Sequence, residues 1–373
     1  MRILHVSEVH WGGVVTLLRH FTDEQARHGH EVHLLAPPSF PRLPAVQQHN
    51  WQVARENPRT FVPAIRELHA LARRLDADVV HLHSFVAGFL GRLPTRRSAE
   101  RPVVYQPHAW AFDLYADPHR RNAIMRWERY AARRTSRVVA NCADEIAEGR
   151  AQGINTPGSV LGIAVDTDYF KPPTPEERAA AKAAVGFAGR PMVLVIGRIA
   201  YQKAQDLLVA AWERFPTPNA DLVLVGPGTW TELRRLTPRS WGTSLHYAGE
   251  SSDVRPWLWA ADVLAIPSRY ETVSLVLGEA MATGLPVVAT RFNGAEEAII
   301  GGDLGAGGEV VQMAAMDDLL RACGERLQSP LKRHVESSNA RRRAERHFSP
   351  EDVYARLQGA YEQAVGLAAA EMA

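Results

Sequence analysis

The chain has 373 residues, of which 46% are hydrophobic and 23% charged, so it is long enough for two domains with separate cores. No apolar run approaches the roughly 20 residues that cross a bilayer, and two distant cysteines exclude a disulfide framework or a cysteine zinc site. The net charge of +2 conceals an asymmetry, because residues 1–165 carry 21 Arg and 15 acidic residues, whereas the remainder carries 22 basic and 26 acidic residues.

The basic first part has two interpretations. It indicates either an anionic partner, such as a membrane surface or a charged acceptor, or the Arg preference of a GC-rich genome. Both cysteines, Cys142 and Cys323, are expected to be core thiols.

The chain opens with a strand, a glycine loop and a helix. Residues 2–6 predict the strand, Gly12 and Gly13 begin a helix over residues 14–27, and residues 32–35 predict the next strand. A glycine pair at a helix start lets the backbone approach a phosphate. Because the first strand is followed at once by polar residues, we expect no signal peptide and a cytoplasmic protein.

Two histidines mark the end of a later strand. Residues 37–60 lack periodicity and predict a long exposed loop, which precedes a helix over 61–74 and a strand over 78–82. Alternation places His81 and His83 on the same side of this strand end, which indicates either a site or only a strand edge.

A third histidine follows the next predicted strand, residues 103–106. His108 then stands at the carboxyl end of a strand, where a parallel sheet presents side chains to a ligand. A lone histidine is more often structural, but this position favours a site.

Residues 119–137 are strongly basic. Seven arginines surround three large apolar side chains, Met125, Trp127 and Tyr130. This stretch either lies on an anionic membrane surface as an amphipathic helix, or packs Trp127 inward with its arginines in water. A strand over 137–140 follows.

The second half begins after a Pro- and Ala-rich segment, residues 172–189, which predicts a linker. Residues 191–196 predict a buried strand, and the loop after it contains Arg198 and Lys203. Two cations at a strand end suit a diphosphate, because Arg binds two oxygens as a fork and Lys supplies a compact charge. An ordinary surface pair is the alternative. The next predicted strand covers residues 222–225, and Gly226 opens the glycine turn that follows it.

Residues 262–300 predict a strand, a polar loop, a helix and a second strand. Glu271 lies in the loop, and Glu279 follows on the helix close to the same face. Amides at the helix start suit a phosphate. They belong to Thr272, Val273, Ser274 and Leu275. Two acids beside a phosphate site suit a nucleotide-sugar, whereas two solvated surface acids are the alternative.

The pattern Glu271-x7-Glu279, continued by Ala280-Met281-Ala282-x-Gly284-x-Pro286, resembles the signature of the retaining family 4 glycosyltransferases of the GT-B fold. The resemblance implies that Glu271 contacts the donor sugar, Glu279 the ribose, and the backbone between them the diphosphate. Arg198 and Lys203 resemble the diphosphate clamp of the family. Thr272 departs from the Gly that is more usual there.

The resemblance extends to the first half. His108 resembles the family's histidine beside the reacting sugar, and His83 and Trp110 lie in segments expected to run into the cleft, so both are candidate acceptor contacts. The candidate donor-binding residues lie at strand ends or helix starts: Gly12, Gly13, Arg198, Lys203, Gly226, Glu271, Thr272, Val273, Ser274, Leu275 and Glu279. The candidate catalytic residues are His108, Glu271, Arg198 and Lys203.

We therefore expect an α/β protein with two Rossmann-like, doubly wound parallel-sheet domains that face each other across a cleft. Residues 1–170 would bind the acceptor and residues 171–348 the nucleotide-sugar. A last helix, in residues 349–373, would cross back to the first domain.

The expected activity is retaining transfer of a sugar from a UDP- or GDP-sugar to a hydroxyl of a small-molecule, glycan or lipid-linked acceptor. We expect no cofactor and no metal, because the basic clamp neutralises the leaving diphosphate. Bacterial cell-surface polysaccharide or natural-product biosynthesis is the expected setting, with no nucleic-acid partner and with peripheral membrane contact through residues 119–137 as an option. The alternatives are a nucleotide-sugar 2-epimerase and a non-catalytic sugar-nucleotide-binding module.

Overall fold

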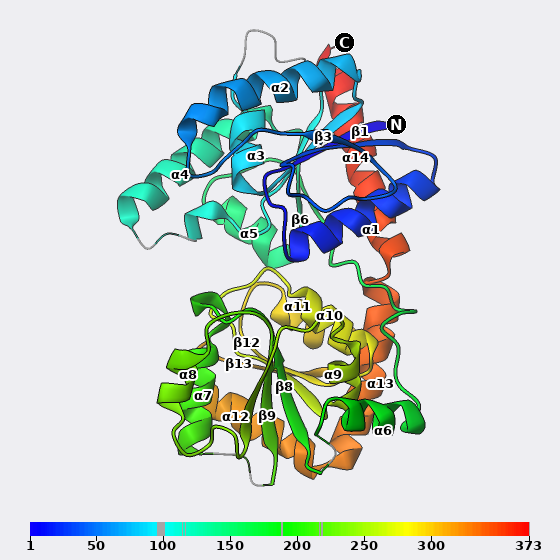
Figure 1. Cartoon of the computed structure of the whole chain (residues 1–373). Helices are drawn as coiled ribbons and strands as arrows, with labels where there is room; N and C mark the ends of the chain where they lie inside the picture. The colour runs from blue at the N-terminus through cyan, green and yellow to red at the C-terminus, as the bar shows by residue number, and fades with distance from the viewer. Residues whose placement is uncertain are drawn as a thin grey trace. The chain divides into compact units, whose positions relative to one another are not determined.

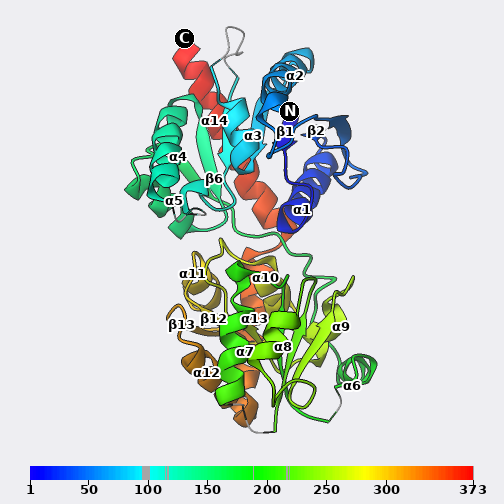
Figure 2. The same ribbon diagram turned by 60° about the vertical axis from the view of Figure 1, so that its left-hand side comes forward.

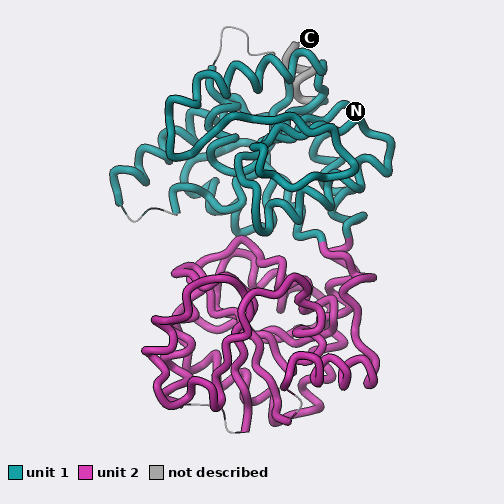
Figure 3. Tube along the Cα trace, viewed as in Figure 1, with its two compact units in different colours: residues 1–164, 350–373 teal, residues 165–349 magenta. Residues whose placement is uncertain are grey.

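Two parallel β-sheets organise the chain in the computed structural model, which describes residues 1–94, 101–113, 115, 117–187, 189–215, 217 and 219–372. Each sheet belongs to its own compact unit. The first unit is Met1–Ala164 with Pro350–Ala373, and the second is Val165–Ser349 (Figure 3). The chain therefore passes from one unit to the other twice.

The first crossing lies six residues before the boundary expected from the sequence, which was residue 170. The Val165 N–H donates to the Phe348 carbonyl at 2.8 Å. The Arg341 guanidinium donates to the carbonyls of Thr167 and Phe170 at 2.9 and 3.0 Å. These bonds attach residues 165–170 to the second unit.

The first unit is built on a seven-stranded parallel sheet in the order β3-β2-β1-β4-β5-β6-β7 (Figure 1). Its strands are β1 (Arg2–Ser7), β2 (Glu31–Ala36), β3 (Gln47–Asn50), β4 (Val79–His83), β5 (Val103–Gln106), β6 (Arg137–Ala140) and β7 (Gly158–Val160). Its helices are α1 (Gly13–Arg27), α2 (Phe61–Arg74), α3 (Ser84–Gly91), α4 (Pro118–Ala131), α5 (Ala143–Ala151) and α14 (Pro350–Met372), with short 3-10 turns η1 (Pro58–Thr60), η2 (Ala111–Asp113) and η3 (Ala132–Arg134). Cys142 is buried and free, as predicted.

Alternate strand residues of the first sheet face different layers. Leu4 and Val6 of β1 belong to the core cluster that α2 and α3 cover. Ile3 of the same strand belongs to a second cluster with Tyr361 of α14. Because strand side chains alternate with a period of two, His5 shares the α14 face. Helix α14 packs beside α1 (Figures 1 and 2), which confirms that the last helix returns to the first domain.

The expected long loop over residues 37–60 contains a strand. β3 has the sequence Gln-Gln-His-Asn and pairs with β2 at the sheet edge, from His33 opposite Gln47 to Ala36 opposite Asn50. An edge strand that is polar on both faces has no apolar alternation, so the pattern did not reveal it.

The second unit is built on a six-stranded parallel sheet in the order β10-β9-β8-β11-β12-β13. Its strands are β8 (Met192–Ile196), β9 (Asp221–Val225), β10 (Leu245–Gly249), β11 (Val263–Ile266), β12 (Val287–Thr290) and β13 (Gly308–Val311). Its helices are α6 (Pro175–Ala184), α7 (Gln205–Arg214), α8 (Thr231–Leu236), α9 (Arg255–Ala260), α10 (Leu275–Ala282), α11 (Ala295–Ile299), α12 (Met316–Gln328) and α13 (Pro330–His347), with the 3-10 turn η4 (Tyr201–Lys203). Helices α7, α8 and α12 share one core cluster, which includes the buried free Cys323.

The predicted linker over residues 172–189 contains helix α6. Thr174 begins it with a capping box, in which the Thr174 side chain accepts from the Glu177 N–H at 3.2 Å and the Glu177 carboxylate accepts from the Thr174 N–H at 2.8 Å. This Thr-x-x-Glu spacing is a helix-start signal. The Pro and Ala content obscured it.

Both sheets have the strand order of a doubly wound fold, in which the order reverses once. The reversal lies between β1 and β4 in the first sheet and between β8 and β11 in the second. In such sheets ligands bind outside the carboxyl ends of the strands at the reversal. The loops that leave these four strands are therefore where a site is expected in each unit.

Candidate active site

In the second unit, Lys203 and Glu271 meet at the reversal of strand order. Lys203 ends the 3-10 turn that follows β8, and Glu271 lies in the loop that follows β11. Their Nζ and Oε1 atoms are 2.5 Å apart, and both side chains are largely buried. The Ser268 hydroxyl donates to the same Glu271 oxygen at 3.1 Å. The structure thus brings together a cation and an acid that the sequence analysis assigned to one site.

Arg269, which the sequence analysis did not single out, holds these two loops together. Its guanidinium donates to both carboxylate oxygens of Asp206, at 2.9 and 2.7 Å, and to the Tyr201 carbonyl at 2.5 Å. Its backbone N–H donates to the Gln202 carbonyl at 2.8 Å. Burial alone would raise the pKa of Asp206, but the hydrogen bonds from Arg269 lower it.

Arg198 lies on the same β8 loop as Lys203, with an exposed side chain. Its backbone is fixed from two sides: the Gln205 side-chain amide donates to the Arg198 carbonyl at 2.9 Å, and the next residue, Ile199, donates to the Pro227 carbonyl at 2.8 Å. A fixed backbone with an exposed guanidinium leaves the charge near the strand end, where the clamp was predicted.

Gly226, predicted as a donor contact, has a structural reason to be glycine. Its φ is 142°, and a Cβ there would lie 2.3 Å from the Gly197 carbonyl oxygen. The Tyr247 hydroxyl donates to the Gly226 carbonyl at 2.9 Å. The turn after β9 can therefore lie directly against the β8 loop only if it carries no side chain.

The anion site at the start of α10 differs from the prediction. The Val273 N–H, which was expected to be open, donates to the Asn293 carbonyl at 3.1 Å, and Thr272 forms a β-bridge with Asn293. Helix α10 begins only at Leu275, with Ser274 as an N-cap residue whose side chain does not cap the helix. The site is thus the first turn of α10 rather than the amides from Thr272 onward.

Val273 itself is strained. Its φ is +62°, a left-handed conformation that a β-branched residue adopts at a cost of about 1–3 kcal/mol. Strain of this kind persists where the surrounding structure imposes it and is frequent at ligand sites.

Glu279 lies on α10, one turn beyond its start. Burial raises the pKa of its carboxyl group to about 7. Across the described residues, no hydrogen bond or ion pair holds this carboxyl group. Glu279 is only partly buried, so an acid without a partner can still meet a ligand hydroxyl there.

In the first unit, the loop after β5 places His108 in a strained turn. His108 and Ala109 have φ values of 54° and 94°. The Glu145 carboxylate accepts from the Ala109 N–H at 2.8 Å and from the Asn141 N–H at 3.1 Å. Burial raises the pKa of Glu145 to about 7. Glu145 was missed by the sequence analysis, and only its place in the first turn of the helix after β6 hinted at it.

Trp110 does not have the predicted acceptor role. Its side chain is 1% exposed, and its indole N–H donates to the Glu145 carbonyl at 2.7 Å. The ring lies beside the rings of Tyr105 and Phe112 in the core. Trp110 therefore belongs to the core on which the loop containing His108 packs.

His83 is also buried, with no exposed surface, so it does not meet an acceptor directly as predicted. Its Nδ1 lies 3.1 Å from His108 Nε2, and its Nε2 lies 2.9 Å from His5 Nδ1. His5, His81 and His83 form a buried group whose nitrogens lie within 4.8 Å of one another, close enough for metal ligation. Burial lowers the pKa of all three.

Gly12 and Gly13 lie at the start of α1, after β1. Gly12 is the N-cap residue with φ of 70°, and neither a side-chain cap nor an acid occupies the first turn. This second open helix start is the predicted phosphate-binding element of the first unit.

The basic stretch 119–137 forms α4, η3 and the first residue of β6. Trp127 packs edge-on against Phe89 with ring centroids 4.7 Å apart, while the exposed Tyr130 lies under the Arg134 guanidinium. Trp127 thus follows the inward-packing alternative. No helix in the described part of the chain is long and apolar enough to cross a membrane.

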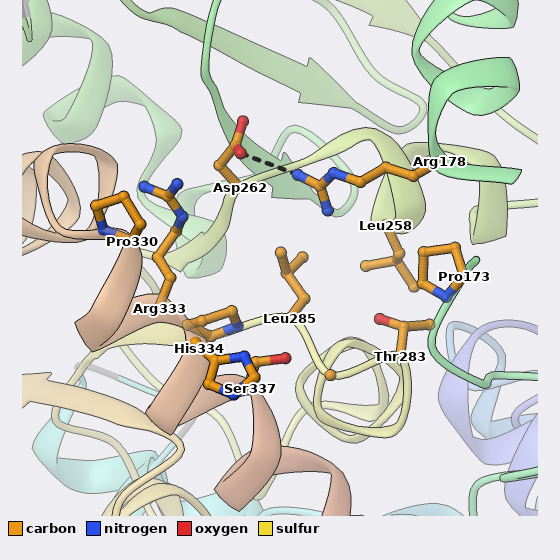
Figure 4. A pocket seen from close by; sticks show the side chains of 12 residues that line it. Pro173, Arg178, Leu258, Asp262, Thr283, Leu285, Pro330, Arg333, His334 and Ser337 are labelled. Carbon is orange, nitrogen blue, oxygen red and sulfur yellow. Dashed lines mark hydrogen bonds and ion pairs between the residues drawn. The ribbon is translucent and has the colours of Figure 1, made fainter. Parts of the chain in front are cut away.

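A separate pocket of about 290 Å³ lies at the opposite end of the second sheet (Figure 4). Its lining includes Asp262 and Pro286, which directly precede β11 and β12, and Figure 4 shows the ion pair of Asp262 with Arg178 at 2.9 Å. Because it opens at the amino ends of these strands, it is not part of the site around Lys203.

Two family models match the chain. Glycosyltransferase Family 4 matches residues 11–169, and Glycosyl transferases group 1 matches residues 190–329. D-inositol 3-phosphate glycosyltransferase of Mycobacterium bovis is 30% identical over 308 residues, which cover 78% of this chain and 62% of that protein. The protein of the same name from Xylanimonas cellulosilytica is 30% identical over 254 residues, covering 62% and 60%. The chain thus spans about 60% of the length of these relatives.

Among solved structures, Alr3699/HepE of Anabaena in complex with UDP superposes with a TM-score of 0.83 at 21% identity, over 96% of this chain and 99% of that chain. The same protein in complex with UDP-glucose gives a TM-score of 0.81. These likenesses confirm the expected fold, with two parallel-sheet α/β domains of the GT-B type.

Proposed function

The chain belongs to the family 4 glycosyltransferases of the GT-B fold, and we propose on this premise that it transfers a sugar from a nucleoside diphosphate sugar to an acceptor hydroxyl. One observation carries the proposal. The Lys203–Glu271 pair joins the loops after β8 and β11, at the reversal of strand order, and the loop that contains Glu271 leads to the first turn of α10. A cation and a helix start suit the diphosphate, and an acid suits the sugar.

The donor is a UDP- or GDP-sugar. UDP is the preferred nucleotide, because the structural neighbour HepE has been solved with UDP and with UDP-glucose. In the bound state Lys203, Arg198 and the first amides of α10 share the charge of the diphosphate. Glu271 accepts a hydrogen bond from a donor-sugar hydroxyl, and Glu279 accepts one from the ribose.

The transfer proceeds with retention at the anomeric carbon. The bond from this carbon to the β-phosphate oxygen breaks, and the acceptor oxygen bonds to the same face. The acceptor proton passes to the departing phosphate. The basic groups stabilise the negative charge that develops on the leaving diphosphate, so this route needs no bound metal ion. His108 in the first unit contacts a carbohydrate hydroxyl.

The acceptor is a hydroxyl of a small molecule, a glycan or a lipid-linked sugar, in bacterial cell-surface polysaccharide or natural-product biosynthesis. The names of the curated relatives add D-inositol 3-phosphate as the first acceptor to try. The arginine excess of residues 1–165 is compatible with a phosphorylated acceptor.

The experiment has two stages. UDP-, GDP- and dTDP-sugars are screened for thermal stabilisation, and the best donor is then incubated with acceptors, with EDTA present and absent. Transfer with the same anomeric configuration, unaffected by EDTA, is the expected result. Formation of an epimer from the donor alone would show that the protein is a 2-epimerase and not a transferase. Donor binding without turnover on any acceptor would favour a non-catalytic binding module.

A further inference from the structure

A continuous line of hydrogen-bonded side chains runs from His108 into the core of the first unit. His108 Nε2 lies 3.1 Å from His83 Nδ1, and His83 Nε2 lies 2.9 Å from His5 Nδ1. His5 Nε2 in turn lies 2.9 Å from the side-chain oxygen of Gln25 on α1.

The line continues onto the C-terminal helix and back to the sheet. The Gln25 amide nitrogen donates to the Tyr361 hydroxyl at 3.4 Å, and this hydroxyl lies 2.7 Å from His81 Nδ1. At the inner end, His81 Nε2 and Gln106 Oε1 are buried atoms that have no hydrogen-bond partner among the described residues. Burial is the largest cause that lowers the pKa of His81, and the neighbouring imidazoles of His5 and His108 lower it further.

All four imidazoles in this line are neutral near pH 7. Burial lowers the pKa of His5 to about 4 and that of His108 to about 3, and it lowers those of His81 and His83 well below the usual value. A neutral imidazole has one N–H and one bare nitrogen. Each hydrogen bond between two of these side chains therefore needs a donor on one side and an acceptor on the other. Once the direction of one bond is known, the protonated nitrogen of each imidazole that follows it is determined.

Gln25 determines the direction of the line. Its amide nitrogen donates to the Tyr361 hydroxyl, and its side-chain oxygen, which can only accept, lies 2.9 Å from His5 Nε2. The Tyr361 hydroxyl also lies 2.7 Å from His81 Nδ1. Burial raises the pKa of Tyr361, so the phenol keeps its proton and its oxygen accepts from the Gln25 amide.

The direction at Gln25 assigns the protonated nitrogen of His5, His83 and then His108, which lies in the loop after β5. Gln25 presents its oxygen to His5, so His5 is protonated at Nε2 and its bare Nδ1 accepts from His83. His83 is then protonated at Nε2, and its bare Nδ1 accepts from His108 Nε2. Only Nδ1 of His108 is left for a ligand, and it carries no proton.

We propose that this line is a tautomer lock, which fixes His108 as a neutral hydrogen-bond acceptor at Nδ1. His108 then contacts only ligand groups that donate, such as a carbohydrate hydroxyl, and it does not bind a phosphate oxygen. Tyr361, Gln25 and His83 are positioning residues for His108, and Tyr361 gives the C-terminal helix a part in the site. The carbohydrate ligand rests on the function proposed above, whereas the tautomer does not.

The grouping of His5, His81 and His83 needs no metal ion to explain it. The facing nitrogens of His5 and His83 already share a hydrogen bond at 2.9 Å. A metal ion would take the lone pairs of both nitrogens and would remove the proton between them. Metal content is therefore a direct counter-test of the lock.

The experiment is two-bond ¹H–¹⁵N NMR of the ¹⁵N-histidine-labelled full chain near pH 7, with signals assigned by single His→Gln variants. We expect His5, His83 and His108 each to be protonated at Nε2 and bare at Nδ1, and the purified protein to contain no stoichiometric transition metal. A proton on Nδ1 of His108, a charged ring, or one metal ion per chain would overturn the proposal.

Two variants on α14 test whether the Tyr361 hydroxyl determines the tautomer of His108. Tyr361→Phe removes the hydroxyl within the line. Tyr354→Phe removes a hydroxyl of the same helix that lies 2.9 Å from His30, outside the line. We expect Tyr361→Phe to give His108 a mixture of tautomers and to lower kcat/KM about tenfold, as the loss of one hydrogen bond would. Tyr354→Phe should change neither quantity.

A single, unchanged His108 tautomer in Tyr361→Phe would overturn the lock. A chain with the expected tautomers that transfers no sugar would instead contradict the proposed function and leave the tautomer assignment standing.

Discussion

Lys203 Nζ and Glu271 Oε1 lie 2.5 Å apart, although the two residues come from loops after different strands. An ion pair that is mostly shielded from water holds the Glu271 carboxylate in one position. The pair is thus a preformed contact for a ligand that carries both a diphosphate and a sugar.

The first prediction concerns the acid of this pair. Glu271→Gln keeps the size of the side chain and removes its charge, so the hydrogen bond to the donor sugar weakens in the transition state. We expect turnover to fall about 100-fold, while the Kd for UDP changes only a few-fold, as measured by steady-state kinetics and calorimetry. Glu296→Gln, in an exposed ion pair with Arg291, is the control. Equal turnover in both variants would contradict the role of Glu271.

The second prediction concerns Arg269 and Asp206, which tie the β8 and β11 loops. A double-mutant cycle with Arg269→Gln and Asp206→Asn should give a coupling energy of about 1 kcal/mol, because Asp206 is half exposed. The pKa of Asp206 is lowered in the folded state, so this stabilisation is present above the pKa of the unfolded chain and is lost as the pH falls through the folded value. Thermal unfolding at pH 7 and in acid measures both effects. A coupling that persists unchanged in acid would show that the charge of Asp206 is irrelevant.

The third prediction concerns Glu279. Its pKa is raised to about 7 by burial, so its ionisation costs stability at higher pH. The cost is absent below the unfolded pKa near 4.5, where both states are protonated, and grows until the pH passes the folded pKa. Glu279→Gln should therefore stabilise the protein at pH 8 by up to about 3 kcal/mol, and should have no such effect at pH 4.5.

The same substitution should weaken binding of a nucleotide more than binding of inorganic diphosphate, because the proposed partner of Glu279 is the ribose. Glu56→Gln, at an exposed position, is the control for both measurements. A variant that is no more stable than the wild type at pH 8 would contradict the buried, ionised state of Glu279.

The fourth prediction concerns Gly226. In Gly226→Ala a Cβ would lie 2.3 Å from the Gly197 carbonyl oxygen, so the β8 and β9 loops must separate. We expect a loss of about 2–4 kcal/mol, seen as a lower thermal midpoint, together with weaker nucleotide binding. In Gly189→Ala the added Cβ meets nothing within 4 Å, so this variant should retain both properties. Equal midpoints for the two variants would contradict the close approach.

Much of the fold could be predicted from the sequence, because buried parallel strands are short apolar runs with recognisable ends. Strands β5 and β6 have the bounds that the apolar runs predicted, and β11 and β12 lie within the predicted strand–loop–helix–strand segment over residues 262–300. Strand β3 could not be found in this way, since its four residues are polar and its stability comes from pairing with β2. Val273 was assigned to a helix because nothing local shows that Asn293 takes its N–H and forces a positive φ.

For the site, the sequence indicated the side chains that a ligand would meet and missed those that hold them. Lys203 and Glu271 stand in a recognisable pattern. Arg269 binds an acid 63 residues away, and His5 binds a histidine 78 residues away. Such pairs depend on which strands are neighbours and in which register, and that information appears only once the chain is folded. Trp110 was misassigned for the same reason, because a large aromatic side chain near a site looks alike whether it faces a ligand or the core.

The central claim is that Lys203 holds the diphosphate of the donor, and calorimetric titration of UDP and uridine into the wild type and Lys203→Ala tests it most directly. Lys182→Ala, which removes a lysine paired with Asp262 at the other end of the sheet, is the matched control. We expect Lys203→Ala to weaken UDP binding about 100-fold and to leave uridine binding unchanged. Lys182→Ala should bind both ligands as the wild type does. UDP affinity that is the same in all three proteins would contradict the account.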